Sequence, residues 1–150
     1  MDELDLQIIQ KLQDNAKLSL KKIAKMLKTP ASTIHFRVQK MIEGEIISKF
    51  SCVVDIEKLG YNTVGWVNLI IDPLKADDIA NKISSFEQVR MVSITGGIYN
   101  LIIQIISKNE KELWNFIQEN VQTIDGVQKL DVNSSLKIYK WDTCYYFNLQ

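Results

Sequence analysis

The chain has 150 residues, with 18 basic and 18 acidic side chains and 46% hydrophobic residues. That length is enough for one domain or two small ones around a buried core, and the zero net charge gives the whole chain no preference for a polyanion. A single histidine (His35) and two distant cysteines (Cys52 and Cys144) exclude a disulfide framework and a Cys- or His-rich metal site. No run of 18 apolar residues and no N-terminal signal pattern is present, so we expect a soluble, cytoplasmic protein with no cofactor and no membrane partner.

The basic residues are concentrated near the start of the chain. Residues 11–49 contain nine basic and three acidic side chains, whereas residues 56–150 contain nine basic and eleven acidic ones. A basic first third followed by a slightly acidic remainder is the asymmetry expected of a chain whose N-terminal part faces a nucleic acid.

Helical spacing of apolar residues predicts three helices in that first third. Leu4, Ile8 and Leu12 fit one amphipathic helix over residues 3–14. Ser19 is a candidate N-cap for a second helix. Thr29 is a candidate N-cap for a third helix that has Pro30 at its first position and ends near residue 44.

From Ile46 onward the apolar pattern changes to a period of two, which predicts strands. The expected elements are a connecting strand (46–55), a strand (61–71), a helix (76–86), two strands (89–95 and 99–107), a helix (113–124) and a final strand (127–138). After the connecting strand, this order is the β-α-β-β-α-β arrangement of a ferredoxin-like unit. The predicted fold class is therefore α+β, with a helix-turn-helix (winged-helix-like) domain over residues 1–50, a connecting strand and hinge over 51–60, and a ferredoxin-like domain over 61–150.

One predicted strand is apolar on both faces, because Ile102 and Ile106 alternate with Leu101, Ile103 and Ile105. Helices cover one face of such a sheet, so the second face needs another cover, and a second copy of the chain is the simplest one. Four aromatic residues near the end of the chain are expected either at a subunit contact or packed on their own domain. They are Trp141, Tyr145, Tyr146 and Phe147.

The third predicted helix presents side chains that can contact DNA. Ser32, Thr33, Phe36, Arg37, Gln39 and Lys40 lie away from its apolar stripe, and an arginine there can read guanine while hydroxyls can read several bases. Lys21, Lys22, Lys25 and Lys28 suit the phosphate backbone. The alternative is an ordinary solvated helix face. If Arg37 reads a base, Arg37→Ala should cost about 1–3 kcal/mol on the operator, whereas a loss independent of sequence would indicate a phosphate contact.

These residues resemble the Lrp/AsnC (leucine-responsive and asparagine regulator, feast/famine) family of prokaryotic transcription regulators. The matching stretches are LDLQIIQKLQDNAKLSLKKIAKML and TPASTIHFRVQKMIEGEIISKFSCVVDIEKLG, which include the Thr33–Val38 run and the Gly44–Ile47 exit. The second half resembles the family's ligand-sensing (RAM) domain, so the resemblance covers nearly the whole chain. It implies a DNA-binding regulator, with DNA contacts at Lys21, Lys22, Lys28, Ser32, Thr33, His35, Phe36, Arg37 and Lys40.

Three departures from the family pattern lie in the DNA-binding part. Leu27-Lys28 replaces a common glycine in the turn, so a non-glycine residue must adopt the turn conformation. Lys22 replaces a capping glutamate, and Phe36 replaces an arginine that follows the histidine. These changes leave the expected fold intact but alter the expected operator sequence.

The resemblance also implies that the second domain forms dimers, that dimers pair into an octamer, and that an amino acid binds between dimers. Residues 97–100 match the family's Gly-x-Tyr-Asp motif, with asparagine in place of aspartate, and Thr95 and Gly96 precede it. The expected ligand residues are Thr95, Gly96, Gly97, Ile98, Tyr99 and Asn100. Asn100 carries no charge, which favours a neutral effector such as glutamine or asparagine. The alternative is a hairpin turn that merely requires two glycines. The family's Thr-x-Thr motif is absent from the last strand, where Ser134 or Ser135 could substitute for it.

The remaining chemistry-bearing residues do not form a catalytic set. His35 has no nucleophile at helical spacing and is expected in core packing or at the DNA backbone, and both cysteines are expected to be small buried apolar residues. A rival interpretation is a ferredoxin-like regulatory subunit or small enzyme with an incidental helical cap, but the acid, base or nucleophile that an enzyme needs is not apparent. We therefore expect a non-enzymatic regulator whose partners are double-stranded DNA, an amino acid and further copies of the chain.

Overall fold

A computed structural model describes residues 1–141 of the chain. Its internal contacts divide the chain into two compact units, Met1–Val54 and Asp55–Tyr139, which are described separately below. The finer boundaries expected from the sequence, at residues 50 and 60, remain a prediction.

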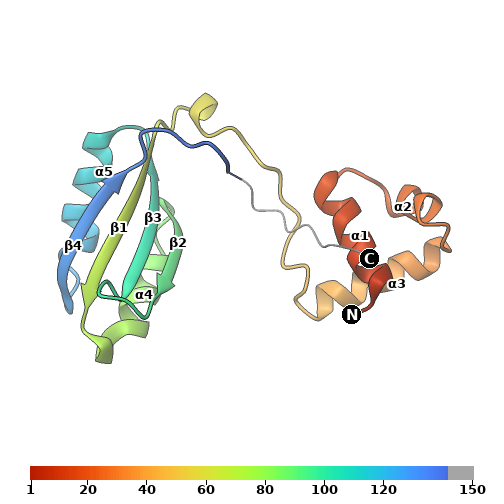
Figure 1. Ribbon diagram of the computed structural model, residues 1–150, viewed down its shortest axis with the longest axis horizontal. Helices are drawn as coiled ribbons and strands as arrows, with labels where there is room; N and C mark the ends of the chain where they lie inside the picture. Colours follow the sequence, from red (N-terminus) through yellow and green to blue (C-terminus); the bar gives the residue numbers. More distant parts are fainter. Residues whose placement is uncertain (142–150) are drawn as a thin grey trace. The chain divides into compact units, whose positions relative to one another are not determined.

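The N-terminal unit contains the three expected helices, α1 (Glu3–Asp14), α2 (Leu20–Met26) and α3 (Ala31–Glu43) (Figure 1). Their apolar faces meet in one small core, as the helical spacing predicts. The buried members are Ile8, Leu12, Ile23, Ala24, Ile34, Val38 and Met41.

Two of the predicted turn features are confirmed and one is wrong. Ser19 caps α2 by accepting a hydrogen bond from the main-chain N–H of Lys22 (3.2 Å), and Lys28 adopts a left-handed conformation (φ 50°), so a non-glycine residue takes the turn conformation as expected. Thr29 does not cap α3. The N-cap is Pro30, which has no side-chain hydrogen bond, and the Thr29 hydroxyl instead donates to the Leu27 carbonyl oxygen (3.0 Å).

The predicted connecting strand over residues 46–55 is wrong, because the structure has no strand between α3 and β1 (Thr63–Ile71). A strand needs a neighbouring strand to pair its main-chain groups, and no described strand pairs with this segment; the N–H groups of Ile46 and Ile47 donate instead to the Met41 carbonyl oxygen. Cys52 lies in the segment and is exposed, which corrects the expectation that it is buried. Cys144 lies outside the described residues.

The C-terminal unit has the predicted β-α-β-β-α-β order. After β1 come α4 (Ala76–Ser84), β2 (Val89–Ile94), β3 (Leu101–Ser107), α5 (Glu110–Phe116) and β4 (Val127–Ser134). The chain also makes short 3-10 turns at Glu57–Leu59 and Pro73–Lys75, and α5 continues into a π-helical turn at Ile117–Val121. The described strands form an antiparallel sheet in the order β2-β3-β1-β4, which confirms the ferredoxin-like arrangement.

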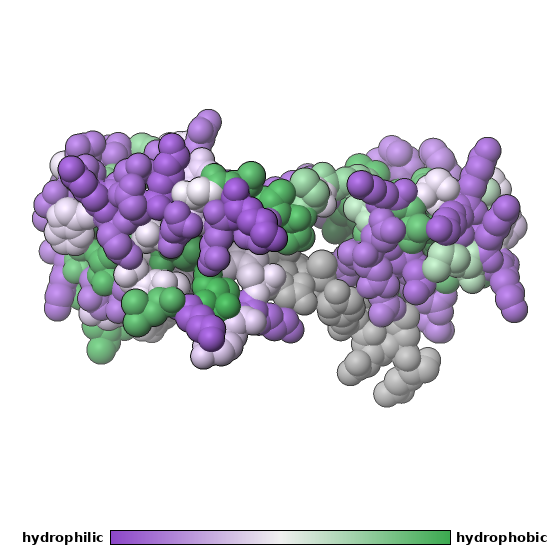
Figure 2. All heavy atoms as spheres, turned by 90° about the horizontal axis from the view of Figure 1, so that it is seen from above, coloured by the Kyte–Doolittle hydropathy of each residue, from purple (hydrophilic) through white to green (hydrophobic). Residues whose placement is uncertain are grey.

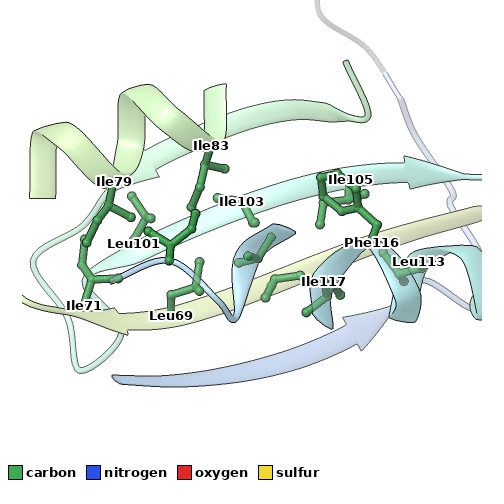
Figure 3. Close-up of a cluster of buried hydrophobic side chains, with 13 residues drawn as sticks. Leu69, Ile71, Ile79, Ile83, Leu101, Ile103, Ile105, Leu113, Phe116 and Ile117 are labelled. Atoms are coloured by element: carbon green, nitrogen blue, oxygen red, sulfur yellow. The ribbon is translucent and has the colours of Figure 1, made fainter. Parts of the chain in front are cut away.

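Both helices of this unit pack on one face of the sheet (Figure 3). Ile79 and Ile83 of α4 and Phe116 of α5 contact a layer of strand residues that is fully buried, including Leu69 and Ile103. Gly65 on β1 allows a close approach here, because a Cβ at this position would lie 2.7 Å from the Leu113 side chain.

The other face of the sheet carries Trp66 and Ile70 of β1 and Ile102 and Ile106 of β3, all half-buried. The cross-strand pairs Trp66–Gln104 and Asn68–Ile102 place these residues on the face opposite the helices. β3 therefore carries apolar side chains on both faces of the sheet, as predicted, and Asn68 and Gln104 are polar members of the face opposite the helices. At the end of the described chain Trp141 is exposed, whereas Tyr145, Tyr146 and Phe147 lie outside the described residues.

Candidate nucleic-acid interface and ligand loop

The lysines expected at a phosphate backbone lie on the surface of α2 and the turn that follows it. Lys21, Lys22, Lys25 and Lys28 are all exposed. Because α2 has no acidic residue, these ammonium groups are not neutralised within their own helix. Hydrophilic residues cover most of the visible face of the N-terminal unit (Figure 2).

Helix α3 buries Ile34, Val38 and Met41 and leaves a second face open. The exposed residues on that face in the first three turns are Ser32, His35, Phe36, Gln39 and Lys40, and Thr33 is half-buried beside them. The exposure of His35 rules out core packing for its ring, one of the two alternatives from the sequence. The Gln39 amide donates to Glu43 on the same helix (3.0 Å).

Arg37 is the exception among the expected DNA contacts, because its guanidinium is bound within the protein. Its Nη1 lies 2.6 Å from Oδ2 of Asp2 and 3.2 Å from Oδ1 of Asp5. Asp5 is 6% exposed and carries its charge next to the apolar core. A buried carboxylate needs such a partner, so Arg37 links the middle of α3 to the first turn of α1.

The same two carboxylates also form a capping box at the start of α1. The main-chain N–H of Asp5 donates to Asp2 Oδ1 (3.1 Å), and that of Asp2 donates to Asp5 Oδ2 (2.9 Å). The hydrogen bond from Arg37 lowers the pKa of Asp2 below its usual value, and the same bond raises the pKa of Arg37. The Asp-x-x-Asp spacing could have revealed the capping box, but the sequence does not reveal a partner 35 residues away.

The expected ligand residues Thr95–Asn100 lie together in the loop between β2 and β3. Thr95 closes the loop through two hydrogen bonds. Its hydroxyl donates to the Tyr99 carbonyl oxygen (2.6 Å), and its main-chain N–H donates to the Asn100 carbonyl oxygen (3.0 Å). The Asn100 side chain is bound twice to the main chain of Ile71, accepting from its N–H and donating to its carbonyl oxygen (2.8 Å each). Each polar atom of this amide therefore makes one hydrogen bond within the chain, which leaves one N–H and one lone pair of the neutral side chain for a ligand.

The two loop glycines are not required by the fold of the single chain. Neither adopts a left-handed conformation, since the described glycines with positive φ are Gly60 and Gly126. A Cβ on Gly96 would meet nothing within 4 Å, and one on Gly97 would meet only the Tyr99 carbonyl oxygen at 3.7 Å. The backbone conformation therefore does not support the alternative that these glycines are present only to form a hairpin turn. Next to them, Ile98 exposes 85% of its surface.

Ser134, the remaining expected ligand residue, does not lie near this loop within one chain. It pairs with Gly65 at the start of β1, whereas Asn100 bonds to Ile71 at the end of that strand. Six residues of extended strand separate these points by about 20 Å. Ser135, the alternative hydroxyl, accepts a hydrogen bond from Trp66 Nε1 (3.2 Å).

Two further sequence expectations concern metals and membranes. Within residues 1–141, no group of three or more His, Cys, Asp or Glu side chains is arranged to hold a metal ion. No helix in this part of the chain is both long and apolar enough to span a bilayer.

Family models match both units of the chain. The AsnC-type helix-turn-helix domain matches residues 1–42, and the PF0864 C-terminal dimeric alpha+beta barrel domain matches residues 68–147. Together they cover the helices of the candidate nucleic-acid interface and the loop at residues 95–100.

Known proteins resemble the chain over nearly its full length. The HTH-type transcriptional regulator FL11 of Pyrococcus furiosus is 34% identical over 143 residues, which is 95% of this chain and 94% of FL11. The structure of Escherichia coli AsnC has 26% identity and a TM-score of 0.87, covering 96% of this chain and 97% of AsnC. The transcriptional regulator NMB0573 of Neisseria meningitidis, solved as a complex with L-Met, has 18% identity and a TM-score of 0.89, covering 99% and 97%, and supports the fold alone.

Proposed function

Because this chain belongs to the AsnC/Lrp family of DNA-binding transcription regulators, which are not enzymes, we propose that it binds a specific operator in the cytoplasm through α3 and the lysines around α2. The observation that carries this proposal is the open face of α3, which combines hydroxyl, imidazole, aromatic and ammonium groups beside an exposed cluster of lysines. A recognition helix in a major groove uses such a face, with its first turns directed at the bases.

The proposed contacts divide into two classes. Lys21, Lys22 and Lys28 bind phosphates, which positions the protein without selecting a sequence. Base edges are read by side chains of α3, namely Ser32, Thr33, His35, Phe36 and Lys40. Arg37, expected from the sequence at a base edge, receives a different role: its bonds to Asp2 and Asp5 hold α3 against α1, so we assign it to positioning.

A gel-shift experiment with genomic fragments at two salt concentrations tests DNA binding by the full chain. Binding should be sequence-selective, and log Kd should rise with log salt because lysine–phosphate contacts release counterions. Lys22→Ala should reduce that slope by about one unit, whereas the matched variant Lys82→Ala, on α4, should leave the slope unchanged. Retention of all fragments with equal affinity would contradict an operator-specific regulator.

We further propose that the sheet face opposite α4 and α5 is covered by a second copy of the chain. Trp66, Ile102 and Ile106 are half-buried apolar side chains on this face, beside Asn68 and Gln104, and water would otherwise contact them. The matched domain model is described as dimeric, and a two-fold pairing would let two α3 helices read half-sites about 34 Å apart. Ile106→Glu should yield monomers in a solution mass measurement, whereas Lys129→Glu, at the edge of the same face, should stay dimeric.

The Thr95–Asn100 loop is the proposed effector site, completed by another copy and filled by an amino acid, with dimers assembling further to an octamer. The fold of the single chain requires neither of the two loop glycines, and it leaves the Ile98 side chain exposed. The N–H groups of Gly96, Gly97 and Ile98 have no partner among the hydrogen bonds of residues 1–141, so they are available to a carboxylate.

Titration of the full chain with each of the twenty amino acids, beginning with L-Met, tests this site. We expect at least one to shift the solution mass or the DNA affinity, because an effector acts only through different affinities for two states. If none of the twenty shifts either quantity, the sensing proposal is wrong while DNA binding is unaffected.

A further inference from the structure

Phe36 is an apolar ring on the polar face of α3. It exposes 66% of its surface, whereas Ile34, Val38 and Met41 of the same helix are 0–5% exposed. Burying a phenyl ring is worth about 1.5–3 kcal/mol, and Phe36 contributes almost none of that to the fold of this chain. The ring is therefore available to a partner.

The position of Phe36 on the helix restricts that partner. Residues four apart on a helix lie on one face, so Phe36 follows Ser32 and precedes Lys40 along one line. This line is opposite the buried stripe, and Phe36 occupies the second turn, near the end of the helix that enters a major groove first. Its neighbour Arg37 is held back by Asp2 and Asp5, so the phenyl ring is the largest side chain that this part of the helix presents.

A phenyl ring has no hydrogen-bond donor or acceptor, so it cannot read the polar groups that line a major groove. Phosphates are excluded for the same reason, and the base faces are stacked on one another. The remaining apolar feature of a base pair in that groove is the C5 methyl group of thymine.

On the basis of the proposed DNA contact by α3, we propose that Phe36 is a specificity-determining residue that contacts a thymine methyl group in the operator. The contact excludes water from both apolar surfaces, whereas cytosine at that position offers no methyl group to cover.

The test removes the methyl group and nothing else. The preferred duplex is first selected from a random pool with the full chain, and each thymine is then replaced singly by deoxyuridine, which keeps the base pair. For the wild-type chain, uracil at one position in each half-site should weaken binding about fourfold, the factor expected for one buried methyl group. 5-Methylcytosine in place of cytosine at that position should recover part of the affinity lost by the thymine-to-cytosine change.

Variants connect the methyl effect to this residue. Phe36→Ala should bind the thymine and uracil duplexes equally, Phe36→Leu should retain part of the preference, and Phe50→Ala, which removes an exposed ring outside α3, should retain all of it. Tm values equal to that of the wild-type chain would confirm that the Phe36 variants fold. A wild-type chain that selects an operator but tolerates uracil everywhere, or an undiminished uracil effect in Phe36→Ala, would refute the methyl contact alone. Failure to select any duplex would instead refute the proposed function.

Discussion

Nη1 of Arg37 in α3 donates to Oδ2 of Asp2, the N-cap of α1, at 2.6 Å, and also reaches the buried carboxylate of Asp5. One guanidinium thus binds both carboxylates of the capping box of the first helix and links them to the helix proposed to face DNA. A residue that the sequence assigns to a base edge is used to build the unit.

Arg37→Ala should therefore act first on stability. Removing the guanidinium leaves the buried Asp5 carboxylate without a cationic partner, with only the Asp2 N–H bonded to it, so we expect Tm to fall by on the order of 5 °C, with Arg37→Lys between the wild type and alanine. DNA affinity should fall by the same factor on every operator variant. A loss confined to one base position, with Tm unchanged, would restore the base-reading role.

The Asp2–Arg37 pair should also make stability dependent on acid. The hydrogen bond from Arg37 lowers the folded-state pKa of Asp2 below 3.8. The ionised Asp2 therefore contributes fully to folding stability above pH 3.8, and this contribution is lost as the pH falls through the lowered folded-state pKa. Between pH 7 and pH 2.5, the Tm difference between wild type and Asp2→Asn should shrink toward zero below about pH 3.8. In an Arg37→Ala background, Asp2→Asn should have little effect at any pH, and a persistent effect would contradict this coupling.

The elements that the sequence predicts correctly are those set by local patterns. Apolar spacing alone locates α1 at residues 3–14, and alternation of apolar and polar residues identifies β4, because both patterns reflect which face is buried. The same reasoning fails for residues 46–55, where alternation is present but no neighbouring strand pairs with the segment.

Side-chain partners far apart in the sequence are the part of the site that could not be predicted. Arg37 and Asp2 are 35 residues apart, and Asn100 and Ile71 are 29 apart, so no local spacing indicates either contact. Arg37 and Asn100 both match family motifs, and the sequence predicts a DNA contact for Arg37 and a ligand contact for Asn100. In the structure, Arg37 instead links α3 to α1, and Asn100 instead links the 95–100 loop to the end of β1.

Asn100→Asp tests the contact between Asn100 and the main chain of Ile71. A carboxylate can accept from the Ile71 N–H but cannot donate to the Ile71 carbonyl oxygen, so one of two hydrogen bonds is lost and two oxygens face each other. We expect the variant to be less stable by about 1–2 kcal/mol in urea unfolding. Asn100→Gln has the same groups on a longer stem and controls for placement. If Asn100→Asp is as stable as the wild type, the amide does not hold the loop.

Substitution of glycines separates the needs of the fold from those of the effector site. Gly126→Ala should destabilise the C-terminal unit by about 1–3 kcal/mol, because the backbone is left-handed (φ 96°) and a Cβ would lie 2.9 Å from Ile79. Gly96→Ala should leave stability unchanged or raise it by up to about 1 kcal/mol, because the backbone tolerates alanine and the space is open.

Gly96→Ala should nevertheless weaken binding of the amino acid identified by titration by at least about tenfold, since a methyl group would stand where a ligand or second chain must approach the N–H groups. Calorimetric titration measures that loss, and Gly60→Ala, which alters a turn remote in sequence from the loop, serves as the control for binding. Unchanged affinity in Gly96→Ala, with the fold intact, would mean that Gly96 serves neither the chain nor the effector.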